Sequence, residues 1–293
     1  MKKLKKTVKC LEKAMNILFL VCGLLTILFV VLITVFLVVS GIPAIQKIGF
    51  LDFMFGKVWA STAAEPSYGI LPFILASVYG TGGAILIGVP IGLLCAVFLA
   101  KMAPPRIGSA VKNVVELLAG IPSVVYGLAG MILLVPWVRE AFGLPDGANL
   151  FSAILVLAVM ILPSVISVSE TAIRAVPKEY EEASLALGAT KTETVFKVVV
   201  PAAKSGIVTA IVLGIGRAVG EAMAVMMVAG NVANMPKLFG SVRFLTTAVA
   251  SEMSYSSGLQ RQALFSIALV LFLFIMIINL ILNVFVKRGG QDE

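Results

Sequence analysis

Long apolar runs separated by short polar segments dominate the pattern of this chain. A helix needs about 20 apolar residues to cross the ~30 Å hydrocarbon core of a bilayer. Because six segments meet this requirement, we predict an all-α membrane protein with six transmembrane helices. They lie at Asn16–Val39, Tyr68–Ala100, Lys112–Val138, Asn149–Ser169, Ser205–Ala229 and Gln262–Val286. This six-span domain covers residues 16–286, between a basic tail at 1–15 and a short tail at 287–293.

Composition supports the membrane assignment. Of the 293 residues, 60% are hydrophobic and 13% are charged, and the mean hydropathy is +1.07. No water-soluble fold of this length needs so much apolar material. Cys10, Cys22 and Cys95 fall in the tail or in spans, so no disulfide is expected. Histidine is absent, which removes the commonest metal ligand and general base, and we expect no cofactor.

Basic residues are distributed unevenly between the two sides of the predicted spans. Most of the 23 lysines and arginines fall on the same side as the amino-terminal tail, and the chain carries a net charge of +8. Cytoplasmic loops are enriched in such residues, so we place both termini in the cytoplasm. Attraction of the basic tail to anionic lipid explains this charge without a nucleic-acid partner.

The charged segment 174–201, between the fourth and fifth spans, has the features of two short helices joined by a glycine turn. Pro177 suits the first turn of a helix, and Gly188 suits a left-handed cap at its end. Thr190 and Glu193 have the spacing of a capping box for a second helix, which Pro201 closes. An amphipathic connector lying on lipid and a docking element for a soluble partner both fit this pattern.

Two ionisable residues, Arg217 and Glu221, lie inside the predicted fifth span. Arg217 is about 18 Å along that helix, close to mid-bilayer, and the four-residue spacing places Glu221 on the same helical face. Ionisable groups at this depth cost roughly 3 kcal/mol each on insertion scales, so they face another helix or a wet cavity.

These two residues allow two interpretations. In the first, they form a structural ion pair, and Gly216 and Gly220 let a neighbouring helix approach closely. In the second, the Arg217 guanidinium binds two oxygens of a phosphate-like anion. Glu221 then orients the guanidinium and weakens the attraction, so that the ion can leave. The depth in the membrane favours the second interpretation.

Several residues of the charged segment resemble the EAA loop of ABC importer permeases. Glu182, Ala183 and Gly188 match that pattern, as does Val200–Pro201, and Ser184 stands where a second alanine is usual. The resemblance implies that these residues form a coupling helix that docks into a cytoplasmic ATPase. The chain has no G-x-x-x-x-G-K-[ST] motif, so ATP hydrolysis falls to another subunit and this chain is not an enzyme.

Two further motifs resemble the C-subunit permease of the phosphate-specific transport system. They are L-G-x-G-R-A-x-G-E at 213–221 and E-L-L-A-G-I-P-S-V-V-Y-G at 116–127. The resemblance covers nearly the whole chain and implies a type I (MetI-like) permease domain in a bacterial or archaeal plasma membrane, with phosphate as substrate. It also implies a sister A-type permease, two ATP-binding subunits and an extracytoplasmic phosphate-binding protein. Ala222 departs from the family, in which threonine is common here.

Glu116 and the segment Asn231–Arg261 are further candidates. Lys112 precedes Glu116 by one turn, which suggests a shallow ion pair, whereas the resemblance implies a gate residue beside the pathway. For Asn231–Arg261, on the outer side, the sequence fits three alternatives: a cap over the pathway, a docking face for a carrier protein, or an ordinary loop. Alternative functions are a permease for another oxyanion, such as sulfate or molybdate, and an ion-gradient transporter. An intramembrane enzyme is disfavoured, because no nucleophile constellation is evident.

Overall fold

The computed structural model describes the backbone of residues 2–289 and the side chains of residues 12–13 and 15–281. Residue 1 and residues 290–293 of the two predicted tails lie outside this description. Within it, the fold is almost entirely helical, and a short antiparallel hairpin provides the strands.

The elements follow one another along the chain in this order. The first half forms α1 (Lys2–Ile48), α2 (Phe50–Phe55), β1 (Trp59–Ala60), β2 (Ser67–Tyr68), α3 (Leu71–Val97), α4 (Pro105–Gly120), α5 (Ser123–Ala129) and α6 (Val135–Ala141). The second half forms α7 (Leu150–Arg174), α8 (Lys178–Ala186), α9 (Lys191–Thr194), α10 (Val200–Ala202), α11 (Lys204–Gly220), α12 (Met223–Val228), α13 (Leu245–Glu252) and α14 (Gly258–Gly289). Short turns of π or 3₁₀ type extend or join several helices: η1 (Phe98–Met102), η2 (Gly130–Leu134), η3 (Val195–Val199) and η4 (Met253–Tyr255).

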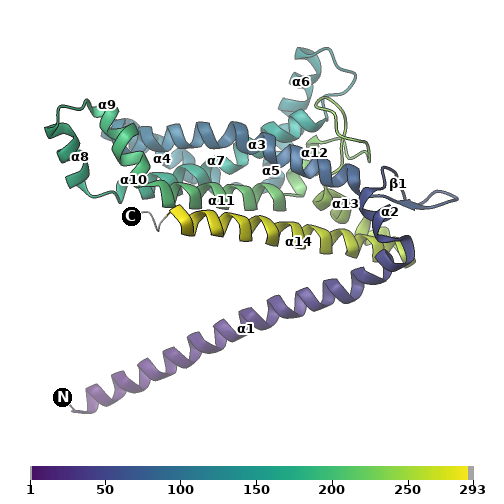
Figure 1. Ribbon diagram of the computed structural model, residues 1–293, viewed down its shortest axis with the longest axis horizontal. Helices are drawn as coiled ribbons and strands as arrows, with labels where there is room; N and C mark the ends of the chain where they lie inside the picture. The colour runs from purple at the N-terminus through teal and green to yellow at the C-terminus, as the bar shows by residue number, and fades with distance from the viewer. Residues whose placement is uncertain (1, 290–293) are drawn as a thin grey trace.

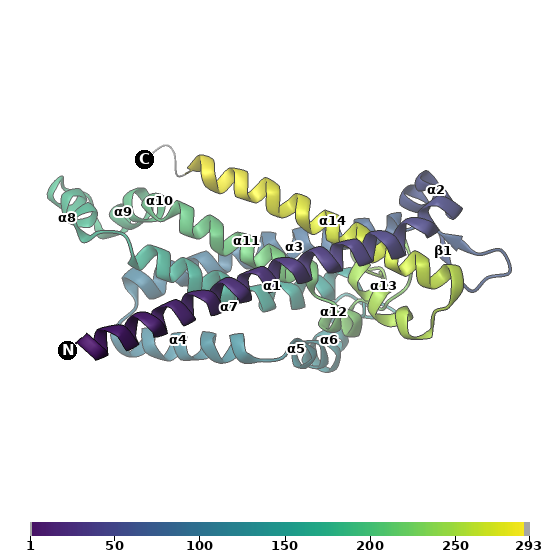
Figure 2. The same ribbon diagram turned by 90° about the horizontal axis from the view of Figure 1, so that it is seen from below.

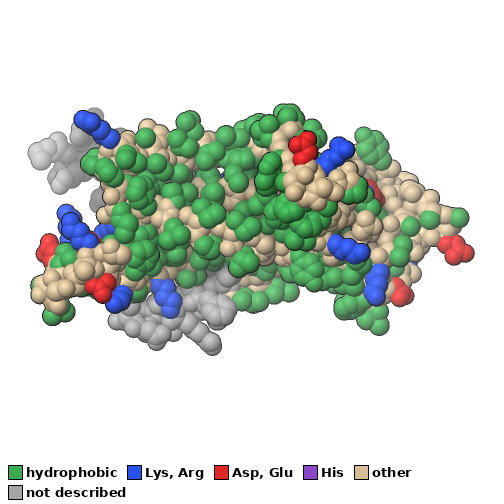
Figure 3. All heavy atoms as spheres, turned by 90° about the horizontal axis from the view of Figure 1, so that it is seen from above, with side chains coloured by type: hydrophobic (Ala, Val, Ile, Leu, Met, Phe, Trp, Pro, Cys, Tyr) green, Lys and Arg blue, Asp and Glu red, His purple; other side chains and the backbone are tan. Residues whose placement is uncertain are grey.

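The long helices α3, α7, α11 and α14 run along the long axis of the molecule (Figures 1 and 2). We call the end that carries α8, α9 and α10 the hairpin end, and the end that carries α2, β1, β2 and α13 the cap end. The start of α1 and the end of α14 both lie at the hairpin end. Charged side chains gather towards the two ends, with a broad apolar surface between them (Figure 3). This distribution is typical of helices that cross a membrane.

Helix α7 forms the centre of the packed core. In its most apolar window 61% of the residues are buried, and it contacts α3, α4, α11 and α12. Small residues bring α3 very close: a β-carbon added at Gly88 would lie 2.8 Å from the Ile161 side chain. Because lipid tails are as apolar as leucine, close packing of this kind is what holds membrane helices together.

Helix α1 is the exception, because it diverges from the bundle (Figure 1). It is joined to α14 near the cap end, where Ser266 Oγ donates a hydrogen bond of 2.5 Å to the Gly41 carbonyl. From Met15 to Ile33, every residue of α1 is exposed. An apolar surface of this size requires lipid or another chain to cover it.

Six spans are present, as predicted, when a bent pair of helices is counted as one. Among the described residues, five helices are long and apolar enough to cross a membrane, and the pair Lys191–Ala202 and Lys204–Gly220, bent by 71°, makes a sixth. Two predicted spans are not continuous, however. Lys112–Val138 is interrupted after Gly120, and Ser205–Ala229 is interrupted after Gly220.

Candidate functional site

The third span is interrupted at Ile121 and Pro122, and the chemistry of proline explains why. Proline disfavours a helical conformation in the preceding residue and lacks an N–H. Ile121 accordingly has extended backbone angles (φ −70°, ψ 128°). The Leu118 carbonyl, which a continuous helix would pair with the N–H of residue 122, accepts a hydrogen bond of 2.8 Å from Tyr126 Oη. Helix α5 then begins at Ser123.

The fifth span is interrupted at Glu221 and Ala222 without a proline. Glu221 is extended (φ −71°, ψ 129°), and its carboxylate accepts a hydrogen bond of 2.9 Å from the N–H of Ala224 in α12. Its carbonyl accepts a bond of 2.7 Å from Thr246 Oγ1. These bonds satisfy polar groups that the break leaves without helical partners. Arg217 and Glu221 therefore do not belong to one continuous helix as predicted, because α11 ends at Gly220, between them.

The two interruptions are neighbours, since α5 packs against α12. A β-carbon added at Gly127 in α5 would lie 2.8 Å from both the Cα of Ala224 and the Sδ of Met227. Only glycine permits this approach. Irregular backbone at membrane depth is tolerated where it is buried in protein or lines a water-filled cavity, and discontinuous spans form the binding sites of many transporters.

Arg217 lies in the last turn of α11, half-buried and directly before the break. Its charge is near the negative end of the helix dipole, which stabilises a cation. The predicted ion pair with Glu221 is not formed, and no other side chain between residues 15 and 281 pairs with the guanidinium. Its five N–H donors are therefore not engaged by side chains of this part of the chain.

The surface beside Arg217 is open. Gly120, Gly216 and Gly220 are exposed, and a β-carbon added at any of them would meet nothing within 4 Å. The G-x-x-x-G pair at Gly216 and Gly220 thus packs against no helix of the described chain, contrary to its interpretation as an internal packing motif. We call the surface of α11 that carries Gly216 and Gly220, four residues apart, the open face.

Glu116 lies on α4, one turn before Gly120, with its side chain exposed. The predicted ion pair with Lys112 is absent from the described ion pairs. Glu116 and Arg217 therefore belong to helices that end at neighbouring breaks, but no contact of Glu116 in the structure assigns it a role.

The segment Asn231–Arg261 is a folded cap that contains α13. Its centre is the half-buried Glu252 carboxylate, which accepts hydrogen bonds from Trp59 Nε1 (3.3 Å) and Gln260 Nε2 (3.1 Å) and pairs with Arg243. These contacts tie α13 to β1 and to the start of α14. The hydroxyl that bonds the Glu221 carbonyl also comes from α13, so the cap contacts the break in the fifth span directly. Sequence reasoning missed this contact, because no local pattern signals a bond between distant residues.

The hairpin end confirms the predicted arrangement of two helices around a glycine turn. Gly188 has φ +87°, in the left-handed region that favours glycine. The N–H groups of Gly188 and Ala189 bond the carbonyls of Leu185 (3.0 Å) and Ser184 (3.2 Å), which is the Schellman pattern of a helix end. Pro177 stands immediately before α8 and not within its first turn.

The second helix of the hairpin begins with the predicted capping box. Glu193 N–H donates to Thr190 Oγ1 (3.3 Å), and Thr190 N–H donates to the Glu193 carboxylate (3.1 Å). Hydrogen bonds from Thr190, and then the neighbouring Lys197, lower the pKa of the Glu193 carboxyl. Ser184, the departure from the EAA pattern, has a purpose here: its hydroxyl lies 2.9 Å from the Thr194 hydroxyl and joins the two helices.

Most of the residues that resemble the EAA loop are on the surface. Glu182, Ala183 and Gly188 are exposed, whereas Ser184 is half-buried between the two helices. Beside them, Leu187 is 90% exposed.

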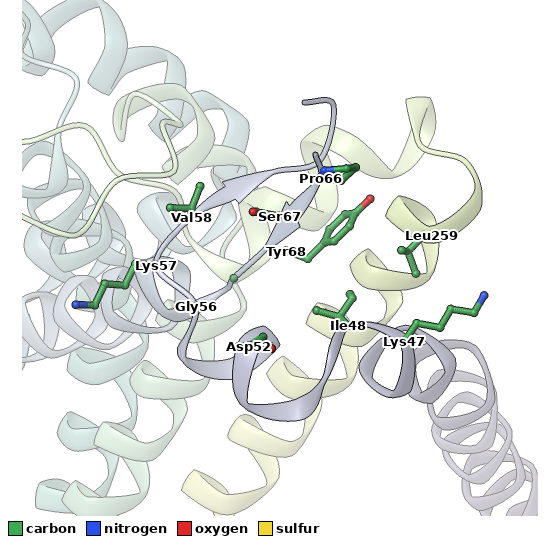
Figure 4. Close-up of a pocket in the computed structure, with 11 residues that line it drawn as sticks. Lys47, Ile48, Asp52, Gly56, Lys57, Val58, Pro66, Ser67, Tyr68 and Leu259 are labelled. Atoms are coloured by element: carbon green, nitrogen blue, oxygen red, sulfur yellow. The ribbon is translucent and has the colours of Figure 1, made fainter. Parts of the chain in front are cut away.

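A cavity of about 530 Å³ opens at the cap end between the end of α1, α2, the β-hairpin and the start of α14 (Figure 4). Lys47 and Lys57 are at its rim and extend in opposite directions, while Asp52 contributes an acid. None of its lining residues is among the predicted pathway residues. The lysines do not converge, so this cavity is not the candidate site for an anion.

Interrupted neighbouring spans are typical of membrane transport proteins. A family model described as "Binding-protein-dependent transport system inner membrane component" matches residues 88–289. The chain belongs to this family, and it is a multi-pass inner-membrane component of an ABC importer.

Individual relatives agree with this assignment. The chain is 40% identical over 267 residues to the probable ABC transporter permease protein YqgH of Bacillus subtilis, covering 88% of this chain and 86% of that protein. It is 34% identical over 287 residues to the phosphate transport system permease protein PstC of Pasteurella multocida, covering 89% and 90%. These relatives are transport subunits, so the prediction that this chain is not an enzyme is confirmed.

Solved structures confirm the predicted MetI-like architecture. A chain of the MetNI methionine ABC transporter in its inward-facing conformation superposes with a TM-score of 0.60 at 22% identity, covering 75% of this chain and 95% of that one. A chain of a bacterial alginate ABC transporter, solved with its alginate-bound periplasmic protein, gives a TM-score of 0.61 at 16% identity and covers 94% of each. At these identities the likeness concerns the fold.

Proposed function

We propose that this chain is the permease subunit of an ATP-driven phosphate importer. Its relatives at 34% and 31% identity that are named phosphate transport system permease protein PstC support this substrate. A sister permease of the A type would supply the other half of the pathway. Two ATP-binding subunits would power transport, and an extracytoplasmic phosphate-binding protein would deliver the ion. The permease itself breaks no bond.

Arg217 is the residue on which the substrate proposal depends. Its guanidinium is not neutralised by Glu221, and it lies beside the open face at two neighbouring breaks. The planar fork of a guanidinium suits two oxygens of a phosphate ion. Glu221 contributes by stabilising the interruption between α11 and α12 through its bond to the Ala224 N–H. Glu116, one turn from the other break, completes the proposed pathway as a gate residue on the side of the hairpin end.

We further propose that the hairpin end faces the cytoplasm, with both termini on that side. The excess of basic residues there supports this orientation. In this arrangement Glu182, Ala183, Ser184 and Gly188 form the coupling helix that docks on an ATP-binding subunit. Closure of the ATP-binding subunits would push the hairpin and switch the pathway from inward-open to outward-open, so that phosphate passes Arg217.

The proposed function is tested by uptake into liposomes that contain the assembled complex. We expect ATP-dependent accumulation of labelled phosphate that excess sulfate does not inhibit. Competition by sulfate or molybdate at equal concentration would indicate a general oxyanion permease. Uptake driven by an ion gradient without ATP would contradict the proposal.

The role of Arg217 is tested by three substitutions in the assembled complex. Arg217→Ala should abolish uptake without loss of assembly, because it leaves no side chain of the described residues unpaired. Arg217→Lys keeps the charge but not the fork, so we expect partial uptake at most. The matched control is Arg261→Ala, at the exposed start of α14, which should transport normally. Near-normal uptake by assembled Arg217→Ala would exclude an anion site at this residue.

A further inference from the structure

Two polar contacts that sequence reasoning missed join the hairpin, α3 and α7 at this end of the molecule. Lys101, in η1 at the end of α3, forms an ion pair with Glu181 in α8. Arg174, in the last turn of α7, donates a hydrogen bond of 2.7 Å from Nη2 to the Leu99 carbonyl. Arg174 is itself held by the buried Glu170 through a bond of 2.8 Å from its Nε. We call the ion pair of Lys101 and Glu181, which links the end of α3 to α8, the hairpin anchor.

The hairpin anchor differs from the other ion pair of the hairpin in its burial. The side chains of Lys101 and Glu181 are 14% and 26% exposed. Those of Lys197 and Glu193, which pair within the hairpin, are 74% and 47% exposed. Exposed pairs contribute little because water and salt screen them. A partly buried pair is screened less, and loss of one partner leaves an uncompensated charge. The anchor therefore constrains the position of α8, whereas the exposed pair does not.

Apolar packing places the hairpin, α3 and α7 in one rigid unit at this end. Val97 of α3, Ile173 of α7 and Val199 of the hairpin are buried in a single cluster with Ala203 at the start of the fifth span. Close-packed interiors transmit strain instead of absorbing it. A push on the second half of the hairpin should therefore move α3 as well as α11, and the hairpin anchor extends this connection to α8.

Helix α3 extends this attachment across the whole molecule. Leu71–Met102 is one helical segment of 32 residues, about 48 Å long at the rise of an α-helix. At the cap end, Ser77 Oγ accepts a hydrogen bond of 3.0 Å from Leu245 N–H at the start of α13. The Arg243 guanidinium lies 5.9 Å from the centre of the Phe73 ring. The segment formed by α3 and η1 thus contacts the hairpin at one end. At the other end it contacts the cap, which also bonds the Glu221 carbonyl.

We propose that Lys101 and Glu181 are positioning residues that make α3 move with the coupling hairpin, so that ATP hydrolysis is tied to movement of the cap over the pathway. The proposal rests on the proposed ATP-driven function. It goes beyond that function by assigning the transmission to a specific ion pair inside the chain. In this role both residues act through each other and not on the substrate.

The first test is the number of ATP molecules hydrolysed per phosphate taken up by the reconstituted complex. Lys101→Gln removes the ion pair, and we expect the ratio to rise about fivefold, the lower range of measured couplings between sites. Lys101→Glu places two carboxylates together and should uncouple further. The exchange Lys101→Glu with Glu181→Lys restores opposite charges and should return the ratio towards that of the natural protein. Failure of the exchange to recover coupling would contradict the proposal.

Lys197→Gln is the matched control, because it removes the lysine of the exposed pair in the same hairpin. It should leave the ratio unchanged. An equal rise in Lys197→Gln and Lys101→Gln would show that any loss of hairpin charge uncouples transport, and the specific role of Lys101 would be excluded. An unchanged ratio in assembled Lys101→Gln would exclude it too.

A second measurement does not depend on the substrate. The native cysteines are first replaced, and spin labels are attached through new cysteines at the exposed positions Ile91 in α3 and Glu179 in α8. The measurement gives the distance between the two labels. We expect one narrow distance that stays the same with ATP or with trapped ADP–vanadate, and a broadened one in Lys101→Gln. A nucleotide-dependent distance in the natural sequence would overturn the proposal. If the complex hydrolyses ATP without importing phosphate, only the substrate assignment fails, and this distance still decides the role of the anchor.

Discussion

At the scale of single residues, the chemistry of this permease depends on where helices stop. Pro122 stops α4 by its steric effect on Ile121 and by its missing N–H, whereas Glu221 stops α11 by offering its carboxylate to the start of α12. The consequence is that Arg217 loses the partner that a continuous helix would have given it. An ionisable group at membrane depth needs a compensating charge or polar partner. For Arg217, we expect the ligand or a second chain to provide the partner that Glu221 does not.

Substitution of Glu221 separates a capping role from a charge-pairing role. Glu221→Gln keeps an oxygen that can accept the Ala224 N–H, so the break should persist and uptake should be largely retained. Glu221→Ala removes the acceptor, which costs about 1 kcal/mol for a lost helix cap, and uptake should fall. Both are measured as phosphate uptake per assembled complex. Equal loss in the two variants would show that the negative charge itself is required.

Ser184 provides a second test at this scale. Ser184→Ala removes the bond to Thr194 and should weaken the hairpin by about 1 kcal/mol. Amide hydrogen exchange in α8 should therefore become roughly fivefold faster. The control is Thr209→Ala, because the Thr209 hydroxyl bonds only the Ser205 carbonyl of its own helix. Unchanged exchange in Ser184→Ala would show that the inter-helix bond does not stabilise the hairpin.

At the scale of elements, the hairpin could be predicted residue by residue and the broken spans could not. The left-handed Gly188 and the Thr190–Glu193 box are local features, set by residues within five positions of one another. The carbonyl at the Glu221 break bonds Thr246, far along the chain, and sequence periodicity carries no information about such a contact. Pro122 was a local signal for the other break. The apolar pattern on both sides of it nevertheless predicted one continuous span.

Gly188 links the conformation of the hairpin to its proposed coupling role. Gly188→Val forces a β-branched side chain into a left-handed conformation, at a cost of roughly 1–2 kcal/mol or more. We expect the protein to insert normally but to lose association with the ATP-binding subunit and uptake. Gly143→Val is the matched control, since Gly143 also has positive φ (60°) with no neighbour within 4 Å, but lies towards the cap end. Normal uptake by Gly188→Val would reduce the hairpin to a simple connector.

At the scale of the whole molecule, the chain is one part of a larger assembly. Helix α1 is exposed over most of its described length, and a β-carbon added at either glycine of the open face would meet nothing within 4 Å. Lipid can cover an exposed apolar helix. Glycines beside a half-buried arginine, however, have little apolar surface that lipid could cover. This combination supports a second permease across the open face, as the proposed pathway requires.

The proposed orientation predicts opposite labelling of two exposed sites. In a cysteine-free background, Tyr255→Cys at the cap end and Leu187→Cys at the hairpin tip provide reporters, because these side chains are 91% and 90% exposed. A membrane-impermeant maleimide added to intact cells should label residue 255 and spare residue 187, which should react only after permeabilisation. Ser256 lies next to residue 255 but is only 8% exposed, so it is unsuitable as a reporter. Leu157→Cys in the buried core is the negative control and should react neither before nor after permeabilisation. Labelling of residue 187 from outside would reverse the topology and remove the hairpin from the reach of any cytoplasmic ATPase.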